Sequence, residues 1–133
     1  MHEYIERLVG AYPAIREVWL IGSRANDCAR PGSDWDYLVF CDDELTFGDL
    51  HLDASFNVPG IDLLVAVDNL NAFNPWSVDT DFGTKTLRLD VLGNNLDWQT
   101  ISETAATYRP LDYPTRRQRE AASLIYRRGT GKR

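Results

Sequence analysis

The sequence predicts an α/β (α+β) domain in which a small mixed β-sheet is flanked by helices. Three short apolar runs, at residues 15–21, 35–41 and 61–67, have the length and the β-branched content of buried strands. Turn residues and stretches with helical spacing separate them, which is typical of strands and helices that share one sheet. The 133-residue length suits a single domain, which we expect to span residues 1–128 and to end in a flexible basic segment at 129–133.

The elements of the N-terminal half follow from local patterns. Residues 2–12 place their apolar side chains at helical spacing, and Pro13 ends this amphipathic helix. A Gly-Ser pair breaks the first strand, and we expect turns or a short helix at residues 24–33. Residues 42–58 are ambiguous, so either a short helix or an irregular crossing is expected there.

The C-terminal half has weaker signals. Residues 73–76, Phe-Asn-Pro-Trp, are expected to form an ordered loop anchored by aromatic side chains. Residues 85–91 favour a fourth strand. Residues 98–108 and 115–128 favour helices, the second with Thr115 as its N-cap.

Charge is distributed unevenly along the chain. The net charge is −6, but residues 1–112 hold 7 basic and 19 acidic side chains, whereas residues 113–133 hold 7 basic residues and one acid, Glu120. Because nucleic-acid binding depends on neutralising phosphates with Lys and Arg, the acidic body is unsuited to that function. We therefore expect no nucleic-acid binding except through the basic C-terminal tail.

The basic tail has three interpretations that the sequence leaves open. It solvates a terminal helix, it balances the charge of the acidic body, or it docks an acidic partner or RNA. We hypothesise docking through residues 127–133, because this end of the tail is expected to be held least by the core.

The sequence also favours a cytoplasmic protein without membrane contact. No segment has the roughly 18 apolar residues of a membrane-spanning helix, and the acidic N-terminus lacks the pattern of a signal peptide. Cys28 and Cys41 lack the spacing of a zinc site, and we expect no special role for them or for His2 and His51.

Gly22 and Ser23 follow directly after the first predicted strand. Glycine lets the backbone turn sharply and approach a ligand closely, and N–H groups exposed at such a turn favour phosphate. Ser23 adds a hydroxyl donor. The alternative is an ordinary Gly-Ser turn, and the absence of a following Walker A lysine excludes a P-loop.

Three aspartates are candidates for metal chemistry. Asp34 and Asp36 stand two residues apart at the start of the second predicted strand, so their side chains point to the same face. Asp62 lies in the third apolar strand, where a lone carboxylate is costly unless it is paired or metal-bound. If these strands are neighbours, the carboxylates converge as oxygen ligands of the kind that magnesium prefers. The alternatives are two surface acids at the strand entry and a third acid at a strand end.

Together these residues resemble the nucleotidyltransferase fold that is shared with DNA polymerase beta. The pattern consists of Gly22-Ser23, ten residues, Asp34-Trp35-Asp36 and the later strand residue Asp62. Within that superfamily the chain looks most like the minimal nucleotidyltransferases, many of which are antitoxins encoded beside a HEPN-domain RNase toxin. The resemblance covers residues 15–67. It departs at Asp27, where relatives often have the last glycine of Gly-Ser-x-Ala-Arg-Gly.

The resemblance implies transfer of a nucleoside monophosphate, expected to be AMP from ATP or another nucleoside triphosphate, onto an acceptor hydroxyl. Two Mg²⁺ ions are implied, which would clamp the attacking and leaving oxygens. The implied catalytic and metal-binding residues are Asp34, Asp36 and Asp62. The implied nucleotide-binding residues are Gly22, Ser23 and Arg24. From the residues alone, Arg24 and Arg30 either approach the phosphates or remain solvated, and Trp76 and Trp98 either stack a base or, as we favour, anchor the core.

Three functions remain open at this point. In the first, the acceptor is a tyrosine or serine hydroxyl of a partner protein, with a HEPN-type toxin as the expected partner. In the second, the acceptor is a small molecule such as an aminoglycoside, which usually needs an additional helical domain. In the third, the chain is an antitoxin-like binding module without turnover. We favour the protein acceptor.

Overall fold

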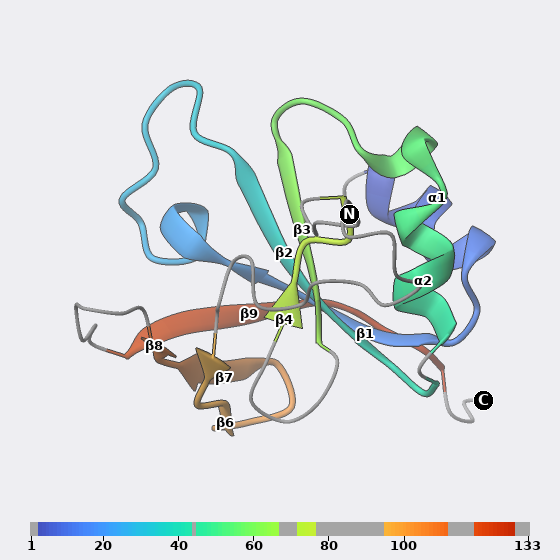
Figure 1. Cartoon of the computed structure of the whole chain (residues 1–133). Helices are drawn as coiled ribbons and strands as arrows, with labels where there is room; N and C mark the ends of the chain where they lie inside the picture. Colours follow the sequence, from blue (N-terminus) through green and yellow to red (C-terminus); the bar gives the residue numbers. More distant parts are fainter. Residues whose placement is uncertain (1–2, 44, 67–71, 77–94, 112–118, 130–133) are drawn as a thin grey trace.

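The computed structural model of the chain describes residues 3–43, 45–66, 72–76, 95–111 and 119–129. Its helical elements are α1 (Glu3–Ala11), α2 (Leu45–His51) and the 3₁₀ turns η1 (Gly22–Arg24) and η2 (Ala54–Phe56). Its strands are β1 (Ile15–Ile21), β2 (Trp35–Cys41), β3 (Ile61–Ala66), β4 (Ala72–Phe73), β5 (Asn95–Leu96), β6 (Gln99–Thr100), β7 (Ala105–Tyr108), β8 (Pro110–Leu111) and β9 (Glu120–Arg127). The architecture is α+β, as the sequence predicts (Figure 1).

The strands among these residues form a mixed seven-stranded sheet and a separate β5–β8 pair. The sheet order is β4-β3-β2-β1-β9-β7-β6. β2 and β3 run parallel, whereas the other neighbours in the sheet run antiparallel. β1 therefore lies centrally, between β2 and the C-terminal strand β9. The sheet curls, so that β9, β7 and β6 diverge from the β2–β3 half (Figure 1).

The predictions for the N-terminal half are confirmed. The runs at 15–21 and 35–41 form β1 and β2 with the expected bounds, and the third run forms β3 up to Ala66, the last described residue there. The predicted helix at 2–12 contains α1, and the ambiguous stretch at 42–58 contains the short helix α2. These elements have strong local periodicity, which is why pattern alone located them.

The helix predicted at residues 98–108 is wrong. This stretch contains β6 and β7, which pair antiparallel with Gln99 opposite Thr107. Burial in β7 alternates, since Ala106 and Tyr108 are buried while Ala105 and Thr107 are only half-buried. A period of two is that of a strand, and contact with neighbouring strands overrode the helical preference of the alanines.

The helix predicted at residues 115–128 is also wrong where the structure describes it. β9 occupies Glu120–Arg127 and is inserted between β1 and β7. The sequence Glu-Ala-Ala-Ser-Leu-Ile-Tyr-Arg mixes helix-forming residues with Ile and Tyr, and pairing on both edges selected the extended form. The strand predicted at 85–91 and the N-cap at Thr115 lie outside the described residues.

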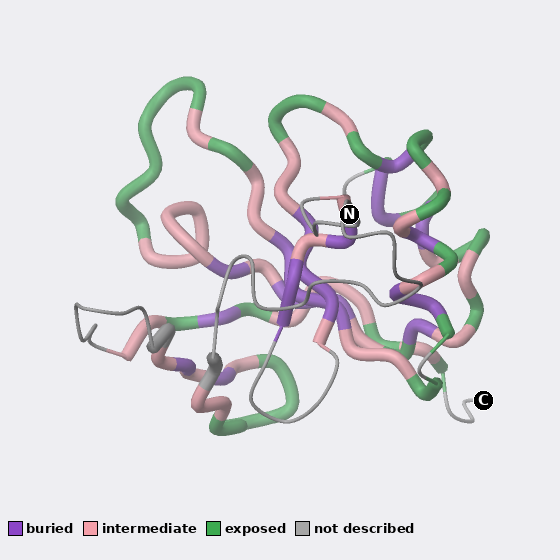
Figure 2. The backbone as a smooth tube through the Cα atoms, in the orientation of Figure 1, coloured by how far each residue is buried: buried purple, intermediate pink, exposed green. Residues whose placement is uncertain are grey.

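The two faces of the sheet carry separate apolar clusters. Buried residues concentrate along the central strands and in the helices (Figure 2). On one face, α1 and α2 cover a cluster that includes Ile5, Leu8, Val18, Tyr37, Val39, Leu50, Leu63 and Val65. On the other face, the second cluster consists of Trp19, Ile21, Leu38, Leu64, Ala72, Ala106, Tyr108 and Ala122. We call this second face the Trp19 face. Of the helices described here, neither is long and apolar enough to cross a membrane.

Trp98 and Trp76 serve as anchors, which agrees with the interpretation favoured from sequence. The Trp98 ring lies edge-on to Trp19 and Phe40, with centroid separations of 5.1 and 5.2 Å. The Trp76 indole N–H donates to the Leu50 carbonyl at 2.7 Å, at the end of α2. Both side chains therefore tie connecting segments to the sheet or to α2.

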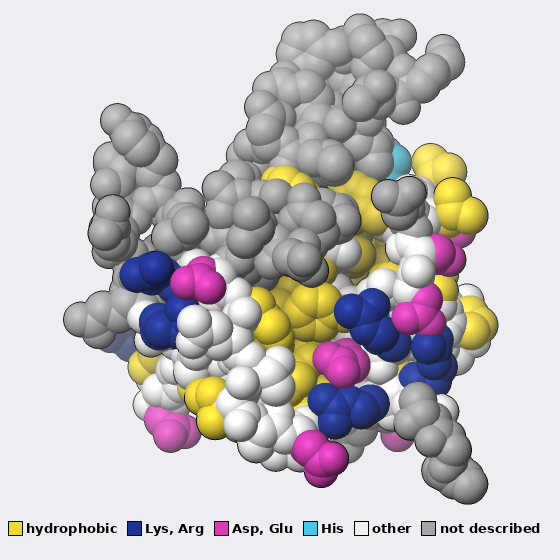
Figure 3. All heavy atoms as spheres, turned by 90° about the horizontal axis from the view of Figure 1, so that it is seen from below, with side chains coloured by type: hydrophobic (Ala, Val, Ile, Leu, Met, Phe, Trp, Pro, Cys, Tyr) yellow, Lys and Arg dark blue, Asp and Glu magenta, His cyan; other side chains and the backbone are white. Residues whose placement is uncertain are grey.

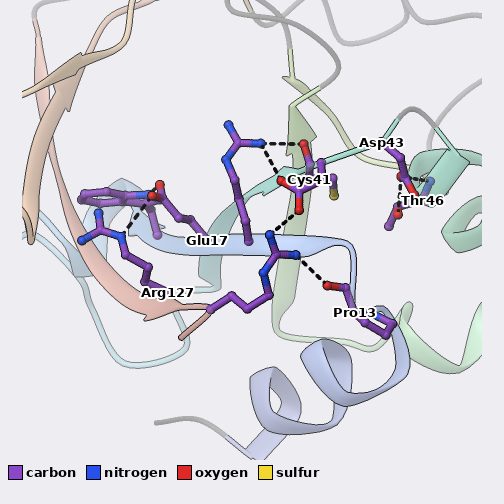
Figure 4. Close-up of polar contacts among 10 residues, drawn as sticks. Pro13, Glu17, Cys41, Asp43, Thr46 and Arg127 are labelled. Carbon is purple, nitrogen blue, oxygen red and sulfur yellow. Dashed lines mark hydrogen bonds and ion pairs between the residues drawn. The ribbon is translucent and has the colours of Figure 1, made fainter. Parts of the chain in front are cut away.

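The C-terminal end of β9 is fixed to the body, which contradicts the basis of the docking hypothesis for residues 127–133. Arg127 Nε donates to Glu17 Oε2 at 3.1 Å, and the Arg128 guanidinium pairs with Asp42 and donates to the Pro13 carbonyl (Figure 4). Acidic and basic side chains also lie next to one another on the surface seen in Figure 3. For these two arginines, charge balance within the molecule is the better interpretation; residues 130–133 lie outside the described part.

Candidate functional site

β1 ends in a tight turn at Gly22. This residue has φ +74°, and the Ala25 N–H donates to its carbonyl at 3.1 Å to close the η1 turn. A Cβ at position 22 would stand 3.0 Å from Asp36 Cγ and closer still to Asp36 Oδ2. Glycine is therefore required for two reasons, since an L-residue is strained at this φ and its side chain would collide with Asp36.

Asp36 and Asp62 are direct neighbours across the parallel strands β2 and β3. Leu38 and Leu64, two residues further along each strand, belong to the Trp19 face. Because side chains alternate along a strand, both carboxylates point to that same face. Asp34 precedes β2 by one residue and is exposed.

The three predicted acids interact electrostatically. Burial raises the pKa of Asp36 to about 6, and the charges of Asp62 and Asp34 add to this rise. The Arg24 guanidinium acts in the opposite direction, and Glu120 adds a further negative charge. Like charges gathered at a half-buried position are unfavourable unless a cation neutralises them. The arrangement is therefore suited to a bound cation.

Asn74, which the sequence did not single out, positions Asp62. Its side-chain N–H₂ donates to Asp62 Oδ1 at 2.9 Å, and its own carbonyl oxygen accepts from the Trp76 N–H at 2.9 Å. One oxygen of Asp62 is thus held in a fixed direction by the chain that follows β3. No pattern in the sequence marks this contact, because it depends on the return of the chain after β3.

Arg24 is the last residue of η1, and its positive charge acts electrostatically on Asp36. Its guanidinium carbon stands 4.2 Å above the Trp35 ring, and its NH2 donates to the Ser33 carbonyl at 2.8 Å. Its buried Nε has no hydrogen-bond partner among the residues that the structure describes. Arg24 and Trp35 also line an open hollow of about 460 Å³, to which none of the three aspartates contributes. Arg30, the other arginine considered from sequence, is exposed.

Ser23 has unused hydrogen-bonding groups among the described residues. Its carbonyl accepts from the Asn26 and Cys28 N–H groups at 3.2 and 3.0 Å. Its own N–H and Oγ bond to no other group in the described ranges. The turn continues to Asp27, which has φ +58° at the position where the resemblance leads one to expect glycine.

The Gly22 N–H is already bonded within the protein. It donates to the Tyr108 hydroxyl at 3.1 Å, and that hydroxyl donates to Glu120 Oε1 at 2.9 Å. Of the two predicted phosphate donors, Ser23 is therefore the one whose N–H has no partner within the described ranges. Sequence reasoning missed Tyr108 and Glu120 because it assigned both to helices.

No protein-family model, curated protein or solved structure matches this chain. The chemistry of the site is therefore inferred from the side chains and backbone groups that form it.

The donor set of the site fits magnesium. Mg²⁺ is commonly held by one or two carboxylates together with substrate phosphates and waters. Asp36 and Asp62 provide such a pair, and Asp34 supplies a third acid near the entry of β2. Within the ranges that the structure describes, no three His, Cys, Asp or Glu side chains form a preformed metal-binding group. The structure thus places two carboxylates side by side in advance.

Proposed function

We propose that this protein is a nucleotidyltransferase-fold enzyme that transfers a nucleoside monophosphate from a nucleoside triphosphate, expected to be ATP, to an acceptor hydroxyl. The observation that carries the proposal is the Asp36–Asp62 pair beside the Gly22 turn. The mixed sheet supports it as well, because β2 and β3 run parallel and so bring the two aspartates into register.

The residues of the chain have distinct roles in this proposal. Asp36, Asp62 and Asp34 hold the metal and the triphosphate attached to it. Bound magnesium would neutralise the phosphates and lower the pKa of the acceptor hydroxyl. Asp62, which Asn74 holds in place through Oδ1, is the carboxylate that accepts the acceptor's proton.

The phosphate groups are bound from the turn after β1. The open N–H and Oγ of Ser23 donate to the phosphates, and Arg24 supplies a positive charge close to Asp36. Gly22 contributes by having no side chain, which leaves room for Asp36. The protein thus acts by position and charge, as phosphoryl-transfer enzymes generally do.

The acceptor that we propose is a tyrosine or serine hydroxyl of a partner protein, with a HEPN-type toxin as the candidate. A small HEPN protein with an RxxxxH motif, encoded by the neighbouring gene, would supply the purified acceptor for the assay. Aminoglycosides added in its place test the small-molecule alternative.

The experiment measures transfer of label from [α-³²P]ATP in the presence of Mg²⁺ and either cell lysate or the purified partner. Asp36→Asn and Asp62→Asn should reduce transfer at least 100-fold, since each removes a ligand charge. Asp49→Asn is the matched control, because this exposed acid lies on α2, which covers the opposite face of the sheet. Equal transfer by Asp36→Asn and Asp49→Asn would overturn the proposal, as would the absence of Mg-ATP binding by the wild-type protein.

A further inference from the structure

The C-terminal strands hold the Gly22 turn from the side opposite to β2. The Tyr108 hydroxyl, on a side chain that is only 3% exposed, accepts the Gly22 N–H at 3.1 Å. Tyr108 and Glu120 are cross-strand partners on β7 and β9, and the same hydroxyl donates to Glu120 Oε1 at 2.9 Å. Glu120 thus orients the hydroxyl so that its oxygen lone pairs face Gly22.

Asn26 makes a second connection between the same turn and β9. Its side-chain N–H₂ donates to the Gly22 carbonyl at 2.8 Å and to the Ala121 carbonyl at 3.2 Å. Its side-chain oxygen accepts the Ala121 N–H at 2.8 Å. The Gly22 N–H is therefore bonded to a side chain of β7. Its carbonyl is bonded to the Asn26 side chain, which is itself bonded to the backbone of β9.

These contacts affect the space that is available to the Asp36 carboxylate. Gly22 packs so closely against this carboxylate that no Cβ fits between them, so a small displacement of Gly22 changes the space in which Asp36 turns. Tyr108 and Glu120 also lie close enough to interact electrostatically with Asp36. The two residues thus act on the candidate metal site through Gly22 and through charge, without contacting the metal themselves.

We propose that Tyr108 and Glu120 are a positioning pair, which fixes the Gly22 turn and through it the orientation of Asp36 for metal and phosphate binding. This inference rests on the proposed function. It gives β7 and β9 a role in the site beyond completing the sheet. Groups that orient metal ligands typically contribute 10- to 100-fold in metal affinity or activity, and we expect an effect at the lower end of that range.

The test combines two measurements on the full chain. Hydrogen exchange of the Gly22 amide, followed by NMR, reports the contact with Tyr108 whether or not the protein is active. Mn²⁺ affinity, measured from the paramagnetic relaxation of water, reports the state of the metal site. Tyr108→Phe should speed Gly22 exchange at least 10-fold and weaken Mn²⁺ binding about 10-fold.

The matched variants separate positioning from general destabilisation. Tyr126→Phe removes a hydroxyl from β9 that has no hydrogen bond to the described residues, and it should change neither measurement. Glu120→Gln retains an oxygen that accepts from Tyr108, whereas Glu120→Ala does not, although both remove the same charge. Gln should therefore preserve the slow exchange of Gly22 and bind Mn²⁺ more tightly than Ala.

The outcomes distinguish this inference from the proposed function. If the wild-type protein binds Mn²⁺ and Tyr108→Phe binds it equally well, the positioning role is wrong and the proposed function stands. If Glu120→Gln and Glu120→Ala are equally impaired, charge rather than orientation explains the effect, and the pair is again rejected. A wild-type protein that binds neither Mn²⁺ nor Mg-ATP would overturn the proposed function and this inference with it.

Discussion

The Asp36 carboxylate occupies the space in which a side chain on Gly22 would begin. Gly32 has a comparable φ, +87° against +74°, but a Cβ added there would meet nothing within 4 Å. Both glycines therefore have a positive φ, but only Gly22 lacks room for a side chain. This makes them a matched pair for mutation.

We predict that Gly22→Ala lowers the free energy of unfolding by about 3 kcal/mol or more, since overpacking adds to the strain of a positive φ. Gly32→Ala should cost only about 1 kcal/mol, from the backbone strain alone. Denaturant unfolding of both variants measures the difference. Equal losses would mean that Asp36 moves aside without cost.

Asp36→Asn should stabilise the metal-free protein at pH 8. The folded-state pKa of Asp36 is raised to about 6, so stability is highest below the ordinary pKa of an aspartate and is lost as the pH rises through 6. Asn avoids that loss, and we expect a gain of about 1–3 kcal/mol at pH 8 and little at pH 4. Urea unfolding in EDTA measures it, with Asp49→Asn as the control.

Adding Mg²⁺ and ATP should make the wild-type protein more stable than Asp36→Asn at pH 8. The wild-type protein should gain stability by ligand binding, whereas Asp36→Asn should gain much less. A variant that is destabilised in EDTA at pH 8 would show that the Asp36 charge already has a stabilising partner in the metal-free protein.

Truncation after Tyr126 should lower the melting temperature by several degrees. It removes the Arg127–Glu17 and Arg128–Asp42 ion pairs and the backbone bond from the Arg128 N–H to the Arg16 carbonyl at 2.8 Å. Exposed ion pairs contribute little individually, so we expect about 1–3 kcal/mol in total.

Truncation after Gly129 is the control, because it leaves these contacts in place. It should spare the melting temperature, and it also tests whether Lys132 and Arg133 dock a partner. Equal melting temperatures for the two truncations would show that the end of β9 contributes nothing to stability.

Asp27→Gly should stabilise the protein by about 0.5–1 kcal/mol, because Asp27 has φ +58° and glycine adopts this conformation without strain. Asp27→Ala should destabilise it, since alanine lacks the local polar contacts that let Asp tolerate a positive φ. Thermal unfolding of the two variants checks the opposite signs. If Ala is as stable as Gly, then φ is not the governing factor at this position.

Local patterns were sufficient for the N-terminal half of the fold. The strands β1, β2 and β3 and the Gly22 turn follow from apolar runs, turn residues and the two-residue period of a strand. These features depend on neighbours in sequence, so no tertiary information was needed to locate them.

The C-terminal half depended on contacts that are distant in sequence. β9 contains residues that favour helices, and it became a strand because β1 and β7 offered it partners on both edges. The same pairing brought Tyr108 and Glu120 to Gly22, and the return of the chain after β3 brought Asn74 to Asp62.

The sequence by itself thus determined which acids and which turn are available to the site. Only the tertiary structure decided how they are held, because strand order and register set which side chains meet across the sheet. A local sequence pattern predicts that a segment is a strand and which residues share a face. It does not predict which other strand will lie beside it.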